Sequence, residues 1–245
     1  MFAAVKLLTV WIGLGVPAAI ITIPWAVMSG NIGLMYRWGM EIVRLGVKAA
    51  GIRVRLEGTE NLPAQPCIFV SNHVSNLDAP VLLPALPGMS SVFIKKKLMS
   101  IPILGMAMRM GKYIPVSRGH SREEAQKSVE YAAEVLRGGR NIVMFPEGTR
   151  STDGTLLPFK KGGFFLAAET GAPMVPVVIR GTAKMMRKGS FRIYPGEAVV
   201  RFLPVVWPEQ FSGREELMQA VRAEMEIALA KDAADAVNLD ADIGK

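Results

Sequence analysis

The sequence predicts an α/β fold, a mostly parallel sheet flanked by helices, with an N-terminal two-helix membrane-anchoring segment. Short apolar runs typical of buried strands alternate with helical periodicity through the middle of the chain. A long uncharged stretch opens the chain and a charged amphipathic stretch lies near its end. We therefore divide the chain into membrane-anchoring helices at residues 1–50, an α/β domain at 51–231 and a flexible tail at 232–245.

Composition favours a protein that meets an anionic surface. Half of the 245 residues are hydrophobic and the formal net charge is +8. The basic residues are scattered among apolar runs without a nucleic-acid-binding motif, so we expect a phospholipid membrane and no nucleic acid as partner. The single cysteine, Cys67, excludes an internal disulfide and a cysteine cluster for zinc, which favours a reducing compartment and no metal site. A cysteine in this apolar run is typical of a small buried side chain, and the alternative is that Cys67 acts as a nucleophile.

The N-terminal stretch from Leu7 to Met28 contains 22 residues without a charge. As a helix it is long enough to cross a bilayer core of roughly 30 Å. A cleaved signal peptide would need a shorter apolar region, and a core helix this close to the terminus would be hard to surround. We therefore expect a membrane anchor. Kinks at Pro17 and Pro24 suit a helix that enters one leaflet as well as one that crosses both.

A second N-terminal helix is predicted from residue 32 to residue 50. Its charged residues Arg37, Glu41, Arg44 and Lys48 follow one another at steps of four, three and four, which places them on one helix face. Such a helix can lie among lipid headgroups or pack on the following domain with its charges in water. We favour the membrane interpretation because this helix adjoins the anchor.

The α/β domain is predicted from strand and helix patterns. Strands are expected at 52–57, 66–70, 91–94, 141–145, 174–179, 191–194 and 198–203. The last two are expected to pair as an antiparallel hairpin. Helices are expected at 98–110, from a capping box of Ser121 and Glu124 to Gly138, from Lys161 to about Gly171, and from Glu215 to Ala234. Because strands and helices alternate, the sheet should be mostly parallel.

The stretch Asn72-His73-Val74-Ser75-Asn76-Leu77-Asp78 contains one of only two histidines. Histidine can accept a proton near neutral pH, and a nearby carboxylate can fix its tautomer and stabilise its cation. A spacing of five does not place two side chains on one helix face, so His73 and Asp78 require a turn between a strand and a helix. The alternatives are a loop histidine with Asp78 as a helix cap, or Ser75 as a nucleophile.

A second motif, Phe145-Pro146-Glu147-Gly148-Thr149-Arg150, follows another predicted buried strand. With Asn72 to Asp78, it resembles the glycerolipid acyltransferase family, and the 1-acylglycerol-3-phosphate acyltransferases in particular. Gly111 to Arg118 is similar to the third motif of this family and Val175 to Val178 to its fourth, all in family order over residues 52–204. The chain departs from the family at Ser117, where an acidic residue is frequent.

The resemblance implies an acyl transfer and a set of site residues. His73 would be the general base and Asp78 would bond its other ring nitrogen. The implied substrate-binding residues are Lys112, Arg118, Glu147, Gly148, Thr149 and Arg150. Arg150 offers donors matched to a phosphate, although it could instead pair with Glu147 to brace the loop.

The resemblance also implies the substrates. The acceptor would be 1-acylglycerol 3-phosphate or a related lysophospholipid, and the donor an acyl thioester of coenzyme A or acyl carrier protein, with no further cofactor. A different acceptor, such as glycerol 3-phosphate or an amino-acid lipid, and a non-catalytic membrane-surface protein remain as alternatives. Because acyl carriers are cytosolic, and Arg37, Arg44 and Lys48 agree with the positive-inside tendency, the catalytic domain is expected to face the cytoplasm.

Overall fold

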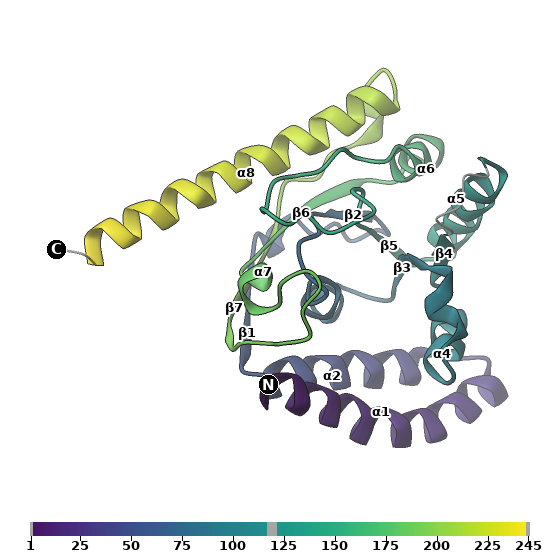
Figure 1. The fold of residues 1–245 in the computed structure, drawn as a ribbon. Coiled ribbons are helices and arrows are strands. Elements are labelled where there is room, and N and C mark those ends of the chain that lie inside the picture. Colours follow the sequence, from purple (N-terminus) through teal and green to yellow (C-terminus); the bar gives the residue numbers. More distant parts are fainter. Residues whose placement is uncertain (1, 117–121, 244–245) are drawn as a thin grey trace.

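The computed structural model describes residues 2–116 and 122–243. The strands among them are β1 (Ile52–Glu57), β2 (Ile68–Ser71), β3 (Ser90–Lys95), β4 (Ile114–Val116), β5 (Asn141–Met144), β6 (Met174–Arg180) and β7 (Gly196–Phe202). They form one sheet in the order β1-β7-β6-β2-β5-β3-β4. Only β6 and β7 are antiparallel among the pairs described. The predicted α/β fold with a mostly parallel sheet is confirmed (Figure 1).

Helices cover both faces of this sheet. They are α1 (Phe2–Ser29), α2 (Gly33–Ala49), α3 (Asp78–Leu82), α4 (Leu104–Met110), α5 (Arg122–Arg137), α6 (Gly162–Thr170), α7 (Thr182–Met185) and α8 (Arg214–Ile243), with short 3-10 helices η1 (Thr59–Asn61), η2 (Leu83–Ala85), η3 (Lys96–Ser100) and η4 (Pro208–Gln210). One apolar core joins the sheet to α5, α6 and α8, and a second joins its other face to α1, α2, α3 and α7. The sheet is therefore buried on both sides, as parallel sheets require.

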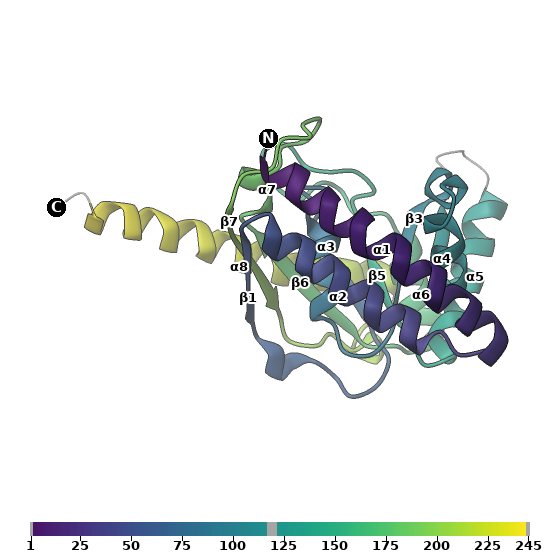
Figure 2. The same ribbon diagram turned by 90° about the horizontal axis from the view of Figure 1, so that it is seen from below.

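The two N-terminal helices lie side by side across one face of the domain (Figure 2). Helix α1 continues through Pro17 and Pro24 and is curved. Trp11 Nε1 donates to Val43 O at 3.4 Å, and a Cβ at Gly46 would lie 2.2 Å from that nitrogen, so the close contact requires glycine there. Helix α1 is the one described helix long and apolar enough to cross a membrane, and only 22% of its most apolar 18-residue stretch is buried.

Helix α2 connects α1 to the domain. The backbone N–H of Ser90 donates to Tyr36 Oη at 3.0 Å, and Arg44 Nη2 donates to Pro84 O at 3.1 Å. Burial raises the pKa of the Tyr36 phenol. The four charged residues that define the predicted amphipathic face are all exposed, so that prediction is confirmed: Arg37, Glu41, Arg44 and Lys48.

Two predicted elements of the domain were wrong. Residues 191–194 form no strand, and the antiparallel partner of β7 is β6. Phe191 is 86% exposed, so its apolar character does not reflect sheet burial. The helix expected at 98–110 is interrupted, because η3 ends at Ser100 and α4 begins only at Leu104. Pro102 lies between them and cannot supply the backbone donor that an uninterrupted helix needs.

The C-terminal end of α8 differs from the prediction, and the predicted N-terminal cap of α5 lies outside the described residues. Helix α8 continues past Ala234 to Ile243, so the predicted helix end was wrong, and the helix occupies most of the segment assigned to a flexible tail (Figure 1). Flexibility of residues 232–245 stays a prediction. The expected cap Ser121 lies outside the described residues, and α5 is described from Arg122.

Candidate active site

The loop that carries His73 leaves the carboxyl end of β2. Asn72 extends the pairing of β2 with β6, because its Nδ2 donates to Ile179 O at 3.0 Å and its Oδ1 accepts from Ile179 N at 2.7 Å. These two hydrogen bonds replace the sheet ladder at the point where the chain turns away. Helix α3 then begins at Asp78, as predicted. His73 is thus placed by a fixed backbone on one side and a helix start on the other.

Asp78 is fully buried and accepts four hydrogen bonds. Its Oδ2 accepts from His73 Nδ1 at 2.8 Å, from Val74 N at 2.7 Å and from Ser75 N at 2.8 Å. Its Oδ1 accepts from Thr182 Oγ1 at 2.6 Å. The turn needed to bring His73 and Asp78 together is therefore present, and Nδ1 carries the proton because a carboxylate can only accept. His73 Nε2 is left with its lone pair available.

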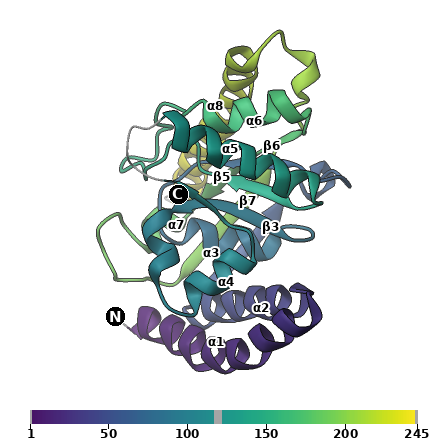
Figure 3. The ribbon, with the colours of Figure 1, turned by 90° about the vertical axis from the view of Figure 1, so that its right-hand side faces the viewer.

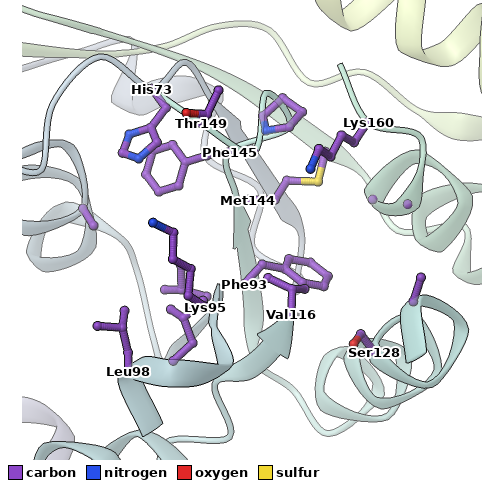
Figure 4. A pocket seen from close by; sticks show the side chains of 18 of the residues that line it. His73, Phe93, Lys95, Leu98, Val116, Ser128, Met144, Phe145, Thr149 and Lys160 are labelled. Carbon is purple, nitrogen blue, oxygen red and sulfur yellow. The ribbon is translucent and has the colours of Figure 1, made fainter. Parts of the chain in front are cut away.

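The imidazole of His73 also packs on an aromatic ring. Its centroid lies 4.4 Å from that of Phe145, with 31° between the planes. Figure 4 shows the two rings together at one end of the pocket. The side chain of His73 is 23% exposed, so the ring is fixed in place while one edge stays open to a substrate. A preorganised base of this kind needs little rearrangement during proton transfer.

The structure opposes both alternative nucleophiles. Ser75 is fully buried, its hydroxyl donates to Met186 O at 2.8 Å and accepts from Leu77 N at 3.3 Å. Cys67 is 1% exposed, and burial raises the pKa of its thiol to about 12, which keeps it protonated. Neither side chain lines the pocket beside His73.

The second motif meets the first because β5 is the neighbour of β2 in the sheet. Glu147 is buried and bridges two loops: its Oε1 accepts from His73 N at 2.7 Å and its Oε2 from Leu157 N at 3.0 Å. Burial raises the pKa of this carboxyl. His73 O in turn accepts from Ser151 N at 2.7 Å. Backbone donors therefore occupy both oxygens of Glu147, and its observed role is to hold the His73 loop rather than to pair with Arg150.

Gly148, Thr149 and Arg150 line a pocket of about 660 Å³ together with His73. Gly148 has a φ of +67°, and a Cβ there would lie 2.6 Å from Lys160 Cε, so the turn requires glycine. Thr149 and its hydroxyl are visible beside His73 in Figure 4. Nη1 of Arg150 is buried and has no hydrogen-bond partner among the described residues. A buried guanidinium donor without a partner is costly unless a ligand meets it.

The rest of the pocket is mainly apolar with cationic groups. Its walls come from β3, β4, η3 and the helices α5 and α6, and include Val92, Phe93, Ile94, Leu98, Val116, Val129 and Met144. Lys95 extends from the end of β3 toward His73 and Phe145, and Lys160 lies over Gly148 (Figure 4). Among the described residues, no group of three His, Cys, Asp or Glu side chains is arranged to hold a metal ion.

Of the predicted substrate-binding residues, one lies away from this pocket and another lies outside the described residues. Lys112 lies in the turn before β4 and is exposed. Since β4 is parallel to β3, the start of β4 lies at the opposite end of the sheet from His73, and Lys112 is not among the residues that line the pocket. A role of Lys112 in substrate binding stays a prediction. Arg118 and its neighbour Ser117 lie outside the described residues.

The structure adds residues that sequence reasoning missed. Thr182 contacts Asp78 from 104 positions along the chain, and it begins the short helix after β6. The only local signal was its position just after the fourth motif. Lys95, in the run Lys95-Lys96-Lys97, and Lys160, in the loop before α6, also line the pocket. The sequence around each gave no sign that distinguished it from an ordinary surface lysine.

A family model for acyltransferases matches residues 53–180. The chain belongs to the acyltransferase family. The matched region includes His73, Asp78 and the Phe145–Arg150 loop. It contains every residue that lines the pocket and ends before β7.

Relatives in this family carry related names. The chain is 33% identical over 187 residues to a 1-acyl-sn-glycerol-3-phosphate acyltransferase of Limnanthes douglasii, a match that covers 76% of this chain and 66% of the relative. It is 34% identical over 157 residues to the alpha form of the human enzyme of that name, covering 64% of this chain and 56% of the relative. The chain thus spans less than two thirds of these relatives' length.

A solved acyltransferase structure has the same fold. The 1-acyl-sn-glycerophosphate (LPA) acyltransferase PlsC from Thermotoga maritima superposes with a TM-score of 0.74, covers 93% of this chain and 96% of its own, and is 24% identical. Only 7% of this chain lies outside the match.

Proposed function

We propose that this protein is a 1-acylglycerol-3-phosphate O-acyltransferase that forms phosphatidic acid. The observation that carries the proposal is the hydrogen-bonded pair of His73 and Asp78 at an apolar pocket that Arg150 also lines. Nη1 of Arg150 is buried and has no hydrogen-bond partner among the described residues. The pair suits a general base, the apolar walls suit acyl chains, and the guanidinium suits a phosphate. The names of the relatives described above support the same acceptor.

The proposed reaction needs no covalent enzyme intermediate. His73 Nε2 takes the proton of the acceptor hydroxyl as its oxygen attacks the thioester carbonyl carbon. The resulting imidazolium is stabilised by the Asp78 carboxylate, which is held at 2.8 Å from Nδ1. When the tetrahedral intermediate collapses, the carbon–sulfur bond breaks and the departing thiolate takes the proton from His73. An ester and a free thiol result, and the base is regenerated.

The donor is proposed to be an acyl thioester of coenzyme A or acyl carrier protein, with no further cofactor. A thioester supplies the activated acyl group by itself, so the site has only to position two substrates and move one proton. The pocket of about 660 Å³ is lined by apolar groups from β3, β4 and α5 that can contact acyl chains. Its cationic residues Lys95 and Lys160 add to the positive charge near Arg150.

Arg150→Ala is expected to weaken binding of a phosphorylated acceptor. Loss of charge-assisted hydrogen bonds should raise the acceptor KM by about 10- to 100-fold, while the donor KM stays close to that of the wild type. Arg150→Lys should recover only part of the loss, because an ammonium lacks the planar fork of donors. Steady-state kinetics with each substrate varied in turn measure this effect.

The matched control for Arg150 is Arg53→Ala on the edge strand β1, which removes an exposed arginine far along the sheet from β2 and β5. Its kinetics should be unchanged. An unchanged acceptor KM in Arg150→Ala, accompanied by a lower melting temperature, would show that the guanidinium only braces the loop and would overturn the phosphate assignment.

The acceptor itself is tested with the purified wild-type protein and a panel of hydroxyl compounds. We expect fastest transfer to 1-acylglycerol 3-phosphate. Faster transfer to glycerol 3-phosphate, another lysophospholipid or an amino-acid lipid would keep the chemistry and replace the acceptor. Transfer to none of them, with either carrier as donor, would favour a non-catalytic membrane-surface protein.

We also propose that α1 and α2 attach the protein to a membrane with the catalytic domain facing the cytoplasm. Helix α1 exposes a long apolar surface, including Ile12, Ile20, Trp25 and Val27. Because α1 runs along α2 instead of projecting from the domain, its apolar face suits burial in one leaflet, parallel to the membrane surface (Figure 2).

The attachment is expected to resist salt. A helix with this much exposed apolar surface should keep the full-length chain in the membrane fraction through washes with 1 M salt and with alkaline carbonate, because neither removes the hydrophobic contribution. Fractionation followed by immunoblotting measures this. Complete release by salt would mean that electrostatic attraction alone holds the protein, and would contradict burial of α1.

A further inference from the structure

A second exposed apolar surface lies between β3 and β4. Residues 98–106, which we call the apolar hairpin, run from η3 into α4. Within them, five large side chains are 38% to 46% exposed: Leu98, Ile101, Ile103, Leu104 and Met106. Single exposed apolar residues are ordinary, but a contiguous group on one short segment marks an interaction surface or a membrane contact.

The apolar hairpin has a defined backbone that presents these side chains. Arg109 Nη1 donates to Met99 O at 2.8 Å, and Gly105 N donates to Ile101 O at 2.7 Å. A Cβ at Gly105 would lie 2.1 Å from Met99 O, so only glycine permits this close packing of η3 on α4. These contacts hold the backbone of the apolar hairpin in one conformation, which keeps its exposed side chains in place.

The apolar hairpin contains a backbone conformation that isoleucine rarely adopts. Ile103 has φ +60° and ψ −61°, and Leu104 N donates to Pro102 O at 2.6 Å, which together define a γ-turn with positive φ. For a β-branched residue such a conformation is a genuine outlier. Core packing does not account for isoleucine here, because the side chain is 44% exposed. An exposed apolar side chain held in this conformation suits a contact with a partner outside the folded chain.

The position of the apolar hairpin connects it with both the membrane helices and the pocket. In Figures 1, 2 and 3, α4 lies near the second half of α1, on the side of the domain that α1 and α2 cover. On its inner side, Leu98 lines the same pocket as His73, and so does the preceding Lys95. The apolar hairpin thus stands between the proposed membrane surface and the proposed reaction site.

The charge of the segment suits anionic lipid. Lys96 and Lys97 are exposed at the base of the apolar hairpin, and Arg109 is exposed on α4. The sequence from residue 95 to residue 112 contains no Asp or Glu. Exposed apolar groups flanked by cations are the pattern that places a segment at the boundary between acyl chains and anionic headgroups.

We propose that the apolar hairpin inserts into an anionic bilayer and forms the entrance through which the lipid acceptor passes from the membrane to the pocket. The entrance role rests on the proposed function. The membrane contact does not, because it depends on the surface alone. The bilayer contact would also orient the domain, since it adds a second point of attachment beside α1.

The decisive variant is Ile103→Asn. Asparagine removes the apolar side chain and tolerates positive φ better than isoleucine, so the melting temperature should be unchanged or higher. Transfer to acceptor embedded in vesicles of phosphatidylcholine and phosphatidylglycerol should fall about tenfold, because one partly buried aliphatic side chain no longer enters the bilayer. Transfer to a short-chain acceptor dissolved below its aggregation concentration should be unchanged.

The matched control is Ile227→Gln on α8, which replaces an aliphatic side chain that is 65% exposed on the opposite face of the sheet. It should leave both rates unchanged. A second arm, Lys96→Gln combined with Lys97→Gln, should lower the rate on anionic vesicles and leave the rate on phosphatidylcholine vesicles unchanged. Equal losses with embedded and dissolved acceptor in Ile103→Asn would place the residue in the pocket and overturn the proposal.

A fluorescence measurement on vesicles tests the membrane contact without relying on acyl transfer. Ile101→Cys can be labelled selectively with an environment-sensitive fluorophore, because the chain's single cysteine, Cys67, is 1% exposed. The label should shift to shorter wavelength on anionic vesicles, whereas the same label at Ile227→Cys should not. No shift at Ile101→Cys would overturn the membrane contact, and a shift without any acyl transfer would retain the contact while the proposed function fails.

Discussion

His73→Ala is expected to lower kcat by about 10²- to 10⁴-fold, the usual contribution of a positioned general base. The free energy of unfolding should fall by only about 1 kcal/mol, because Asp78 keeps its hydrogen bonds from Val74 N, Ser75 N and Thr182 Oγ1 after the imidazole is removed. Single-turnover kinetics with saturating substrates, beside a thermal melting curve, measure the two effects separately.

A matched control removes the chain's other histidine, His120, which belongs to none of the sequence motifs. His120→Ala should retain turnover. If purified His73→Ala turned over at a rate near that of the wild type, proton transfer by His73 would be contradicted, whatever the stability of the variant.

Asp78→Asn is expected to have a comparable effect on kcat, about 10²-fold or more, with little change in fold. The amide is isosteric with the carboxylate. Its oxygen can accept from His73 Nδ1 and the two backbone N–H groups if its NH₂ donates to Thr182, whose hydroxyl can also accept. What is lost is the negative charge that stabilises the imidazolium as it forms. Steady-state kinetics and a melting curve check this.

Thr182 provides the control for Asp78. Thr182→Val removes the donor at Oδ1 and should lower the free energy of unfolding by about 1–3 kcal/mol, with a smaller loss of kcat than Asp78→Asn, because the charge beside His73 remains. Thr182→Ser should restore both quantities. Near-normal kcat in Asp78→Asn would show that Asp78 serves only to cap α3 and order the loop.

Much of the site was predictable because its parts are local. A buried apolar run, a polar loop and an acidic residue at a helix start lie within a dozen positions, and together they specify the turn that joins His73 to Asp78. The strand before Glu147 was recognised in the same way. Local patterns were insufficient for residues 191–194, where exposed aromatic residues imitate a strand, and at Pro102, where a helical pattern of apolar residues is broken.

Sequence by itself determined the alternation of strands and helices, the two N-terminal helices, the His73–Asp78 pair and the loop that ends at Arg150. Tertiary structure decided how these parts meet. The order of strands placed β5 beside β2, turned Glu147 into a brace for His73 and brought Thr182 to Asp78. It also left Lys112 at the far end of the sheet, because residues before and after a parallel strand lie at opposite edges. Spacing along the chain fixes which side chains share a turn, but only strand order and direction fix which turns share a pocket.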